Sequence, residues 1–123
     1  MQRCLIVDDE EDHRFIAKKA IQHLGVDINE ACDGREALNL CKETMPDIIV
    51  LDMMMPDTDG KQFMEQLRKL EGGEKPKVIV CTATSDLDEL YETMLNDVFS
   101  YLSKPFCSSN LETKVAEAMR YIR

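Results

Sequence analysis

Features that would indicate a membrane segment, secretion or a zinc site are scarce in these 123 residues. No run of roughly 18 apolar residues occurs, and the N-terminus has no signal-peptide apolar region, so no membrane association is expected. The five cysteines are odd in number and form no Cys-x-x-Cys pair. Reduced, mostly buried thiols in a cytoplasmic protein are therefore expected. The two histidines, His13 and His23, are expected on a helix surface, and a zinc site is not.

Basic residues are also few, because 15 Lys and Arg stand against 24 Asp and Glu, for a formal net charge of −9. This balance disfavours direct binding to nucleic acid or to anionic membranes. Hydrophobic residues make up 44% and charged residues 32%, which is ordinary for a globular domain. We expect residues 1–123 to form one domain, since the length fits one and no repeat or linker interrupts it.

Short apolar runs alternate with segments whose apolar residues recur every three or four positions. The runs have strand length and the periodic segments indicate amphipathic helices. Strands are expected over 4–7, 26–28, 48–51, 78–81 and 98–102, and helices around 15–24, 37–41, 63–70, 87–94 and 111–122. Ser109 and Glu112 have capping-box spacing at the start of the last helix. Strand and helix alternate five times, which predicts an α/β fold with a parallel sheet covered on both faces.

Polar side chains follow four of the predicted strands at the point where each strand ends. Asp8 and Asp9 follow the first strand, Asp52 the third, Thr82 the fourth and Lys104 the fifth. In an open parallel sheet, ligands bind outside the carboxyl ends of the strands. If these four strands lie side by side, the five residues meet in one pocket.

The residue types in this pocket suit phosphoryl chemistry. Three carboxylates repel one another, and a hard divalent cation such as Mg²⁺ removes that repulsion while accepting oxygen ligands. Lys104 adds a compact positive charge for phosphate oxygens, and Thr82 offers a hydroxyl donor. Asp52 is then the expected nucleophile, which would become an aspartyl phosphate.

This constellation resembles the receiver domain of two-component response regulators, over the whole chain. The resemblance implies a flavodoxin-like (βα)5 fold, with five parallel strands in the order 2-1-3-4-5 and helices on both faces. All four motifs occur in order, each at a predicted strand end. They are Leu5-Ile6-Val7-Asp8-Asp9, Leu51-Asp52-Met53-Met54-Met55-Pro56-Asp57-Thr58-Asp59-Gly60, Cys81-Thr82-Ala83 and Tyr101-Leu102-Ser103-Lys104-Pro105-Phe106.

The resemblance also implies roles for the metal-binding and phosphoryl-binding residues. Asp52 would accept the phosphoryl group, and Lys104 would contact it. Mg²⁺ or Mn²⁺ would be bound by Asp52, by Asp9 directly, by Asp8 mainly through water, and by the backbone carbonyl of Met54.

Four further positions match the family's conformational switch. Thr82 would reach the phosphoryl group after moving inward, and Tyr101 would turn into the space that it leaves. Ala83 is small where a phosphate oxygen approaches the backbone, and Pro105 matches a cis-proline. The face formed by the fourth helix, fifth strand and fifth helix would change shape as a shift between two states.

The implied function is signalling rather than enzymatic turnover of a substrate. The donor would be a phosphohistidine on a sensor histidine kinase or a histidine phosphotransfer protein. The output would be binding to a protein target or onward transfer of the group, by a monomer or a weak phosphorylation-dependent dimer.

Two alternatives belong to other classes. A flavin or nucleotide binder on the same plan should have a first loop rich in Gly, Ser or Thr, whereas residues 8–12 are all acidic. A receiver-like interaction module that is never phosphorylated usually lacks the acceptor, the lysine or the acidic pair, all of which are present here.

Overall fold

The computed structural model describes residues 2–53, 60–83, 98–104 and 107–121. Five parallel strands form one sheet in the order β2-β1-β3-β4-β5, which confirms the predicted topology. Because β1, β3, β4 and β5 are consecutive neighbours, the strands that carry the predicted site residues do lie side by side. The strands are β1 (Arg3–Val7), β2 (Asp27–Ala31), β3 (Ile48–Asp52), β4 (Lys77–Ala83) and β5 (Ser100–Lys104).

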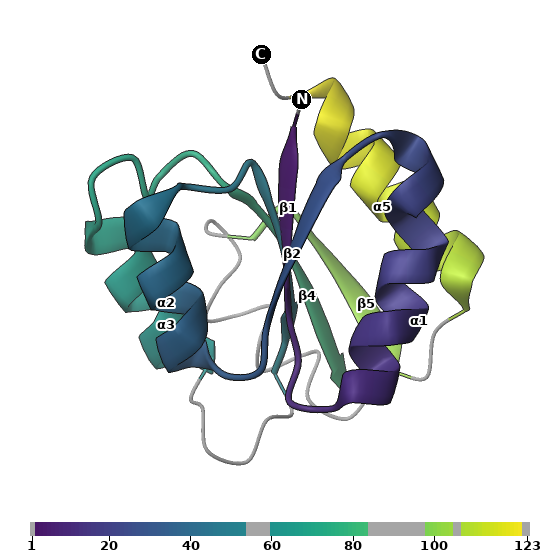
Figure 1. The fold of residues 1–123 in the computed structure, drawn as a ribbon, viewed down its shortest axis with the longest axis horizontal. Helices are drawn as coiled ribbons and strands as arrows, with labels where there is room; N and C mark the ends of the chain where they lie inside the picture. The colour runs from purple at the N-terminus through teal and green to yellow at the C-terminus, as the bar shows by residue number, and fades with distance from the viewer. Residues whose placement is uncertain (1, 54–59, 84–97, 105–106, 122–123) are drawn as a thin grey trace.

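Four α-helices in the described ranges cover the sheet, two on each face. In Figure 1 the sheet is seen nearly edge-on, with α2 and α3 on the left and α1 and α5 on the right. None of these helices is long and apolar enough to cross a membrane. The helix predicted around 87–94 lies outside the described residues. The bounds are α1 (Glu11–Ile21), α2 (Gly34–Glu43), α3 (Gly60–Lys69) and α5 (Ser108–Arg120), and the 3₁₀ helix η1 (Gln22–Leu24) follows α1.

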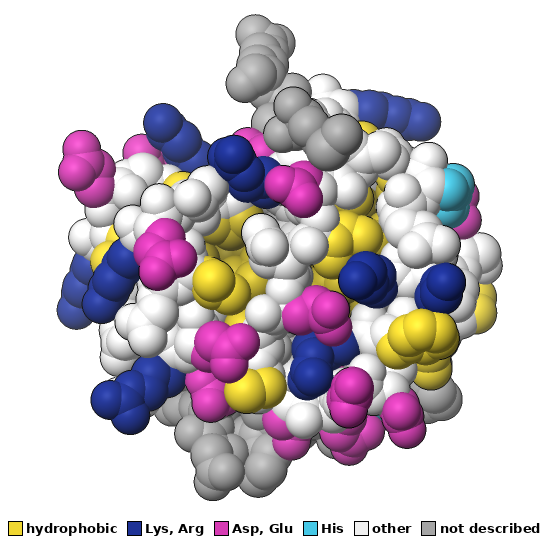
Figure 2. All heavy atoms as spheres, viewed as in Figure 1, with side chains coloured by type: hydrophobic (Ala, Val, Ile, Leu, Met, Phe, Trp, Pro, Cys, Tyr) yellow, Lys and Arg dark blue, Asp and Glu magenta, His cyan; other side chains and the backbone are white. Residues whose placement is uncertain are grey.

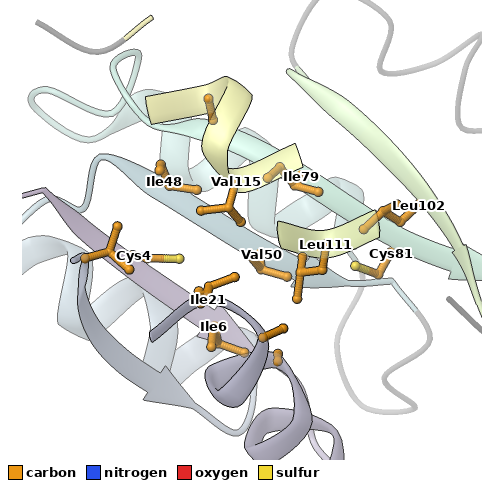
Figure 3. Close-up of a cluster of buried hydrophobic side chains, with 14 residues drawn as sticks. Cys4, Ile6, Ile21, Ile48, Val50, Ile79, Cys81, Leu102, Leu111 and Val115 are labelled. Atoms are coloured by element: carbon orange, nitrogen blue, oxygen red, sulfur yellow. The ribbon is translucent and has the colours of Figure 1, made fainter. Parts of the chain in front are cut away.

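The buried side chains form two clusters, one on each face of the sheet. Successive residues of a strand point to opposite faces, so Leu5 and Val7 pack with α2 and α3, whereas Cys4 and Ile6 pack with α1 and α5. Figure 3 shows this second cluster, where Leu111 of α5 lies over the inner strands. Burial on both faces explains why β1 and β3 are apolar almost without interruption until an acid follows or ends them.

The strand register brings the predicted site residues to one edge. Val7 pairs with Leu51, so Asp8 follows β1 at the level where Asp52 ends β3. Asp52 in turn pairs with Cys81. Ala83 at the end of β4 pairs with Lys104 at the end of β5. The carboxyl ends of four neighbouring strands therefore form one edge.

The fifth strand begins two residues later than predicted. It spans Ser100–Lys104 rather than 98–102, because pairing with β4 starts at Ile79 and Ser100. Val98 and Phe99 pack on opposite core clusters, so their apolar character reflects burial before the strand begins.

The predicted capping box of the last helix is wrong. Cys107 is the N-cap of α5, and it makes no side-chain cap hydrogen bond. Ser109 lies within the first turn, where its carbonyl accepts a hydrogen bond from Thr113 Oγ1 at 2.9 Å. The Glu112 carboxylate instead contacts His23 Nε2 at 3.2 Å, so it is directed toward η1 and away from the helix terminus.

The predicted first helix forms, but its apolar residues are not all buried. Ala17, Ala20 and Ile21 pack on the sheet and against α5, whereas the side chains of Phe15 and Ile16 are 59% and 51% exposed. Small alanine side chains allow α1 to lie close to its neighbours, and this orientation leaves the two larger side chains on the surface.

All five cysteines are free, and three of them are buried, as predicted. Burial raises the pKa of Cys4 and of Cys81 to about 12, and that of Cys41 to about 11. Those three side chains remain neutral thiols near neutral pH and behave as small apolar groups.

The two exposed cysteines are expected to react with iodoacetamide at different rates. Hydrogen bonds to the Ser109 side chain and the Asn110 backbone lower the pKa of Cys107, whereas a hydrogen bond to the Glu36 carboxylate raises the pKa of Cys32. At a pH just below the ordinary pKa of a thiol, a larger fraction of Cys107 than of Cys32 is therefore thiolate, the reactive form. Peptide mapping should find Cys107 alkylated first in the folded protein and both at similar rates in urea. Equal rates in the folded protein would contradict this reading.

Candidate functional site

Three hydrogen bonds fix Asp8 at the carboxyl end of β1. Its backbone N–H donates to the Ala31 carbonyl at 3.1 Å, and Oδ1 accepts the Glu10 backbone N–H at 2.9 Å. Arg14 Nη1 donates to the Asp8 carbonyl at 2.7 Å. The residue is 7% exposed. Its second oxygen, Oδ2, therefore points from a fixed position toward Lys104, 3.3 Å from Nζ.

Asp8, Asp9 and Asp52 form one carboxylate cluster, as predicted. One oxygen of each lies within 4.8 Å of an oxygen of the others. Asp52 is 4% exposed and Asp9 is exposed, so the cluster opens to solvent on one side. Figure 2 shows acidic side chains gathered along the lower edge, where α1 begins in Figure 1. A cluster of carboxylate oxygens, two of its three residues buried, fits a hard divalent cation such as Mg²⁺, and these three residues would hold it.

Lys104 is the cation of this site. Its Nζ lies 3.2 Å from Asp52 Oδ2 and 3.3 Å from Asp8 Oδ2. Burial opposes the charged form, but the carboxylates of Asp52 and Asp8 outweigh it and raise the pKa of Lys104 above its ordinary value. The ammonium therefore stays charged beside Asp52 throughout the neutral range. A fixed positive charge at that point suits the oxygens of a phosphoryl group.

Thr82 and Tyr101 lie on the same face of the sheet. Val80 belongs to the cluster under α2 and α3, and Thr82, two residues later, points to that face as well. Tyr101 pairs with Val80 in the register and packs, half-buried, against this cluster. Thr82 is 1% exposed. The two side chains are therefore diagonal neighbours on adjacent strands, next to the carboxyl edge.

Three predicted site features cannot be assigned from the described residues. Met54 and Pro105 lie outside them, so the metal-binding carbonyl and the cis-proline remain predictions. Ala83 is described as part of β4, but its side chain is not.

His13 is at the site, although the sequence indicates only a surface residue without a partner. It is on the surface, with 42% of its side chain exposed. Its Nδ1 lies 3.3 Å from Lys104 Nζ and 3.5 Å from Asp8 Oδ2, and its Nε2 lies 2.8 Å from Glu10 Oε2. The sequence feature that could have predicted this position is that His13 follows Asp9 by four residues, in the first turn of a helix that begins at the carboxyl edge.

The fold and site together define an α/β protein with an acidic, lysine-containing pocket at the carboxyl edge of a parallel sheet. The family model described as the response regulator receiver domain matches residues 4–116. The chain belongs to this family, whose members act in two-component signalling.

Curated relatives have the same region within longer proteins. "Probable transcriptional regulator ycf27" of Porphyridium aerugineum is 33% identical over 98% of this chain and 49% of that protein. "Response regulator MprA" of Mycolicibacterium vanbaalenii is 34% identical over 96% of this chain and 50% of that protein. The chain thus spans about half the length of these relatives.

Solved structures of receiver domains superpose over nearly the whole chain. The chemotaxis response regulator CheY4 of Vibrio cholerae covers 96% of this chain, with a TM-score of 0.85 and 26% identity over 98% of its own length. A response regulator receiver domain protein from Clostridium thermocellum covers 98%, with a TM-score of 0.84 and 25% identity over 95% of its own length. These matches agree with the observed strand order.

Proposed function

We propose that residues 1–123 form a receiver that accepts a phosphoryl group on Asp52. The observation that carries this proposal is the placement of Lys104 Nζ 3.2 Å from Asp52 Oδ2, beside the carboxylates of Asp8 and Asp9. A nucleophilic carboxylate, a cation and oxygen ligands are what phosphoryl transfer needs, since this reaction depends on positioning and charge stabilisation.

The donor in this proposal is a phosphohistidine of a sensor kinase or a phosphotransfer protein. An Asp52 carboxylate oxygen attacks phosphorus, the P–N bond breaks, and its electron pair goes to the imidazole, which takes a proton from solvent. Lys104 stabilises the negative charge on the phosphoryl oxygens. Water later attacks phosphorus, breaks the acyl phosphate bond and releases phosphate, which returns Asp52 to a carboxylate.

Asp8, Asp9 and Asp52 would hold Mg²⁺ during this reaction. The bound ion would supply positive charge to the phosphoryl oxygens and offset the repulsion among the three carboxylates. Free cysteines, two of them exposed, are consistent with a reducing compartment, and we infer the cytoplasm.

The output in this proposal is a shift of shape near β5 and α5. The phosphoryl group would draw the Thr82 hydroxyl toward Asp52, and Tyr101 would follow into the space that it leaves. The two side chains share a sheet face, which supports this coupling. The changed surface would then bind a protein target, or the group would pass to another histidine.

The function is tested by intact mass after incubation with acetyl phosphate and Mg²⁺. Wild type should gain one phosphoryl group only when Mg²⁺ is present, and Asp52→Asn should gain none because it lacks the nucleophile. Asp12→Asn removes an exposed carboxylate outside the cluster and should gain the group as wild type does. Labelling of Asp52→Asn, or none of folded wild type, would refute the proposal.

Phe15 and Ile16 are expected to contribute to docking of the protein donor. Both are exposed on α1, which begins two residues after Asp9, so a donor that reaches Asp52 passes close to them. Phe15→Ser and Ile16→Ser should each slow transfer from a kinase that labels wild type by about tenfold, as for a buried interface anchor. Labelling by acetyl phosphate should stay within about twofold, since it needs no docking surface. Equal slowing with both donors would contradict a docking role.

A further inference from the structure

The Lys104 ammonium has three hydrogen-bond acceptors, and one of them is not a carboxylate. A lysine ammonium carries three N–H groups. Its Nζ lies 3.2 Å from Asp52 Oδ2, 3.3 Å from Asp8 Oδ2 and 3.3 Å from His13 Nδ1. Among the residues that the structure describes, the histidine therefore supplies the third acceptor around the cation.

The contacts of the His13 ring suit a tautomer with its proton on Nε2. Nε2 lies 2.8 Å from Glu10 Oε2, an acceptor, so Nε2 must be the donor. In the tautomer with its proton on Nε2, Nδ1 has a lone pair and can accept a hydrogen bond from the Lys104 ammonium, 3.3 Å away. A proton on Nδ1 would instead face the N–H groups of the permanently charged Lys104. Nδ1 also lies 3.5 Å from Asp8 Oδ2. Both atoms then accept hydrogen bonds from the same Lys104 ammonium.

We propose that His13 is a positioning residue for Lys104: its Nδ1, 3.3 Å from Nζ, accepts a hydrogen bond from the ammonium and holds it over Asp52. Glu10 fixes the ring through Nε2. This inference rests on the proposed function, because its consequence is faster phosphoryl acceptance at Asp52.

The need for such an anchor follows from the competing demands on the carboxylates. Asp8 and Asp52 would bind Mg²⁺, and Asp52 would bond to phosphorus, so both would leave Lys104 with weaker contacts. The lysine stem is long and flexible. His13 has neither of those tasks, and it stands on α1, which Ala17, Ala20 and Ile21 pack firmly on the sheet. A group held by a rigid element limits the positions of the ammonium at the moment of transfer.

The test compares wild type with His13→Ala, His13→Asn and His23→Ala. Asparagine places Oδ1 close to the position of Nδ1 and keeps an acceptor, whereas alanine removes it. His23 is the matched control, because it is also exposed and paired with a carboxylate, Glu112, away from the site. Thermal unfolding of each variant verifies that it is folded.

The first readout is the side-chain ammonium signal of Lys104 in a ¹⁵N-correlated NMR spectrum, recorded without donor. Its protons exchange slowly with water only while acceptors hold them. The signal should persist in wild type, His13→Asn and His23→Ala and be weakened by faster exchange in His13→Ala. The second readout is the rate of labelling by acetyl phosphate at saturating Mg²⁺. This rate should fall about threefold to tenfold in His13→Ala, which is the effect expected for the loss of one hydrogen bond. In His13→Asn it should lie within about twofold of the wild-type rate.

The positioning role would be overturned if His13→Ala behaved like His23→Ala in the ammonium signal, or in the labelling rate when wild type is labelled. It would also be overturned if His13→Asn restored neither the signal nor the rate, since the acceptor would then not be what matters. Failure of the proposed function is separate. It would show as no labelling of wild type, while the ammonium signal would still decide whether His13 holds Lys104.

Discussion

Replacing Lys104 with methionine is expected to slow labelling by acetyl phosphate about a hundredfold, the usual cost of removing one preorganised donor from a transition state. Methionine keeps most of the volume of the side chain but removes the ammonium that lies 3.2 Å from Asp52 Oδ2. The phosphoryl oxygens then develop charge without that partner. The rate is measured by intact mass against time at saturating Mg²⁺.

Lys75→Met is the matched control for this experiment. Lys75 is exposed in the turn before β4, and it has the same side chain without a place in the site. Lys75→Met removes one positive charge, as Lys104→Met does, so it reports any general electrostatic effect on the anionic donor. A Lys104→Met rate within about twofold of the Lys75→Met rate would contradict the role of the ammonium, because removal of a preorganised donor should slow the reaction far more.

Mg²⁺ is expected to raise the melting temperature of wild type more than that of Asp9→Asn. An ion that binds only the folded state stabilises it by about 1.4 kcal/mol at ten times its dissociation constant, which is about 5 °C for a domain of this size. Asp9→Asn removes one of the three clustered carboxylates and with it most of this shift. The measurement is thermal unfolding with and without millimolar MgCl₂.

The same experiment has a second expected result, in which the substitution of Asp9 raises the melting temperature. Without Mg²⁺, Asp9→Asn should melt above wild type, because one source of repulsion among the three carboxylates is gone. Asp12→Asn, which removes an acid outside the cluster, should keep the full Mg²⁺ shift. NaCl at equal ionic strength controls for screening of surface charge. Equal Mg²⁺ shifts in wild type and Asp9→Asn would contradict a metal site there.

The fold and the centre of the site could be predicted because buried parallel strands have a simple signature. Residues 48–51 are apolar without a break and Asp52 ends the run, so the end of the strand and a functional residue coincide. The same holds for Asp8 after β1. Neighbouring parallel strands end at one edge, so these acids and Lys104 had to meet once the strands were adjacent.

Other features depend on packing that a periodic pattern does not specify. The spacing of Phe15, Ile16 and Ile21 predicts a helix, but it does not determine which arc of that helix faces the sheet. The spacing of Ser109 and Glu112 predicts a capping box, but Glu112 pairs with His23, a residue distant in the sequence. The N-cap of α5 is Cys107 instead. His13 was missed for a similar reason, since its partner Lys104 is 91 positions away.

The central claim is that the phosphoryl group is carried by the Asp52 side chain. Borohydride reduces an acyl phosphate to an alcohol, so it converts a phosphorylated aspartate into homoserine and leaves a free carboxylate unchanged. Peptide mapping after labelling with acetyl phosphate and Mg²⁺, followed by borohydride, should find homoserine at position 52 and at no other aspartate. Homoserine at another position, or a phosphoryl group retained on a histidine or serine, would contradict the claim.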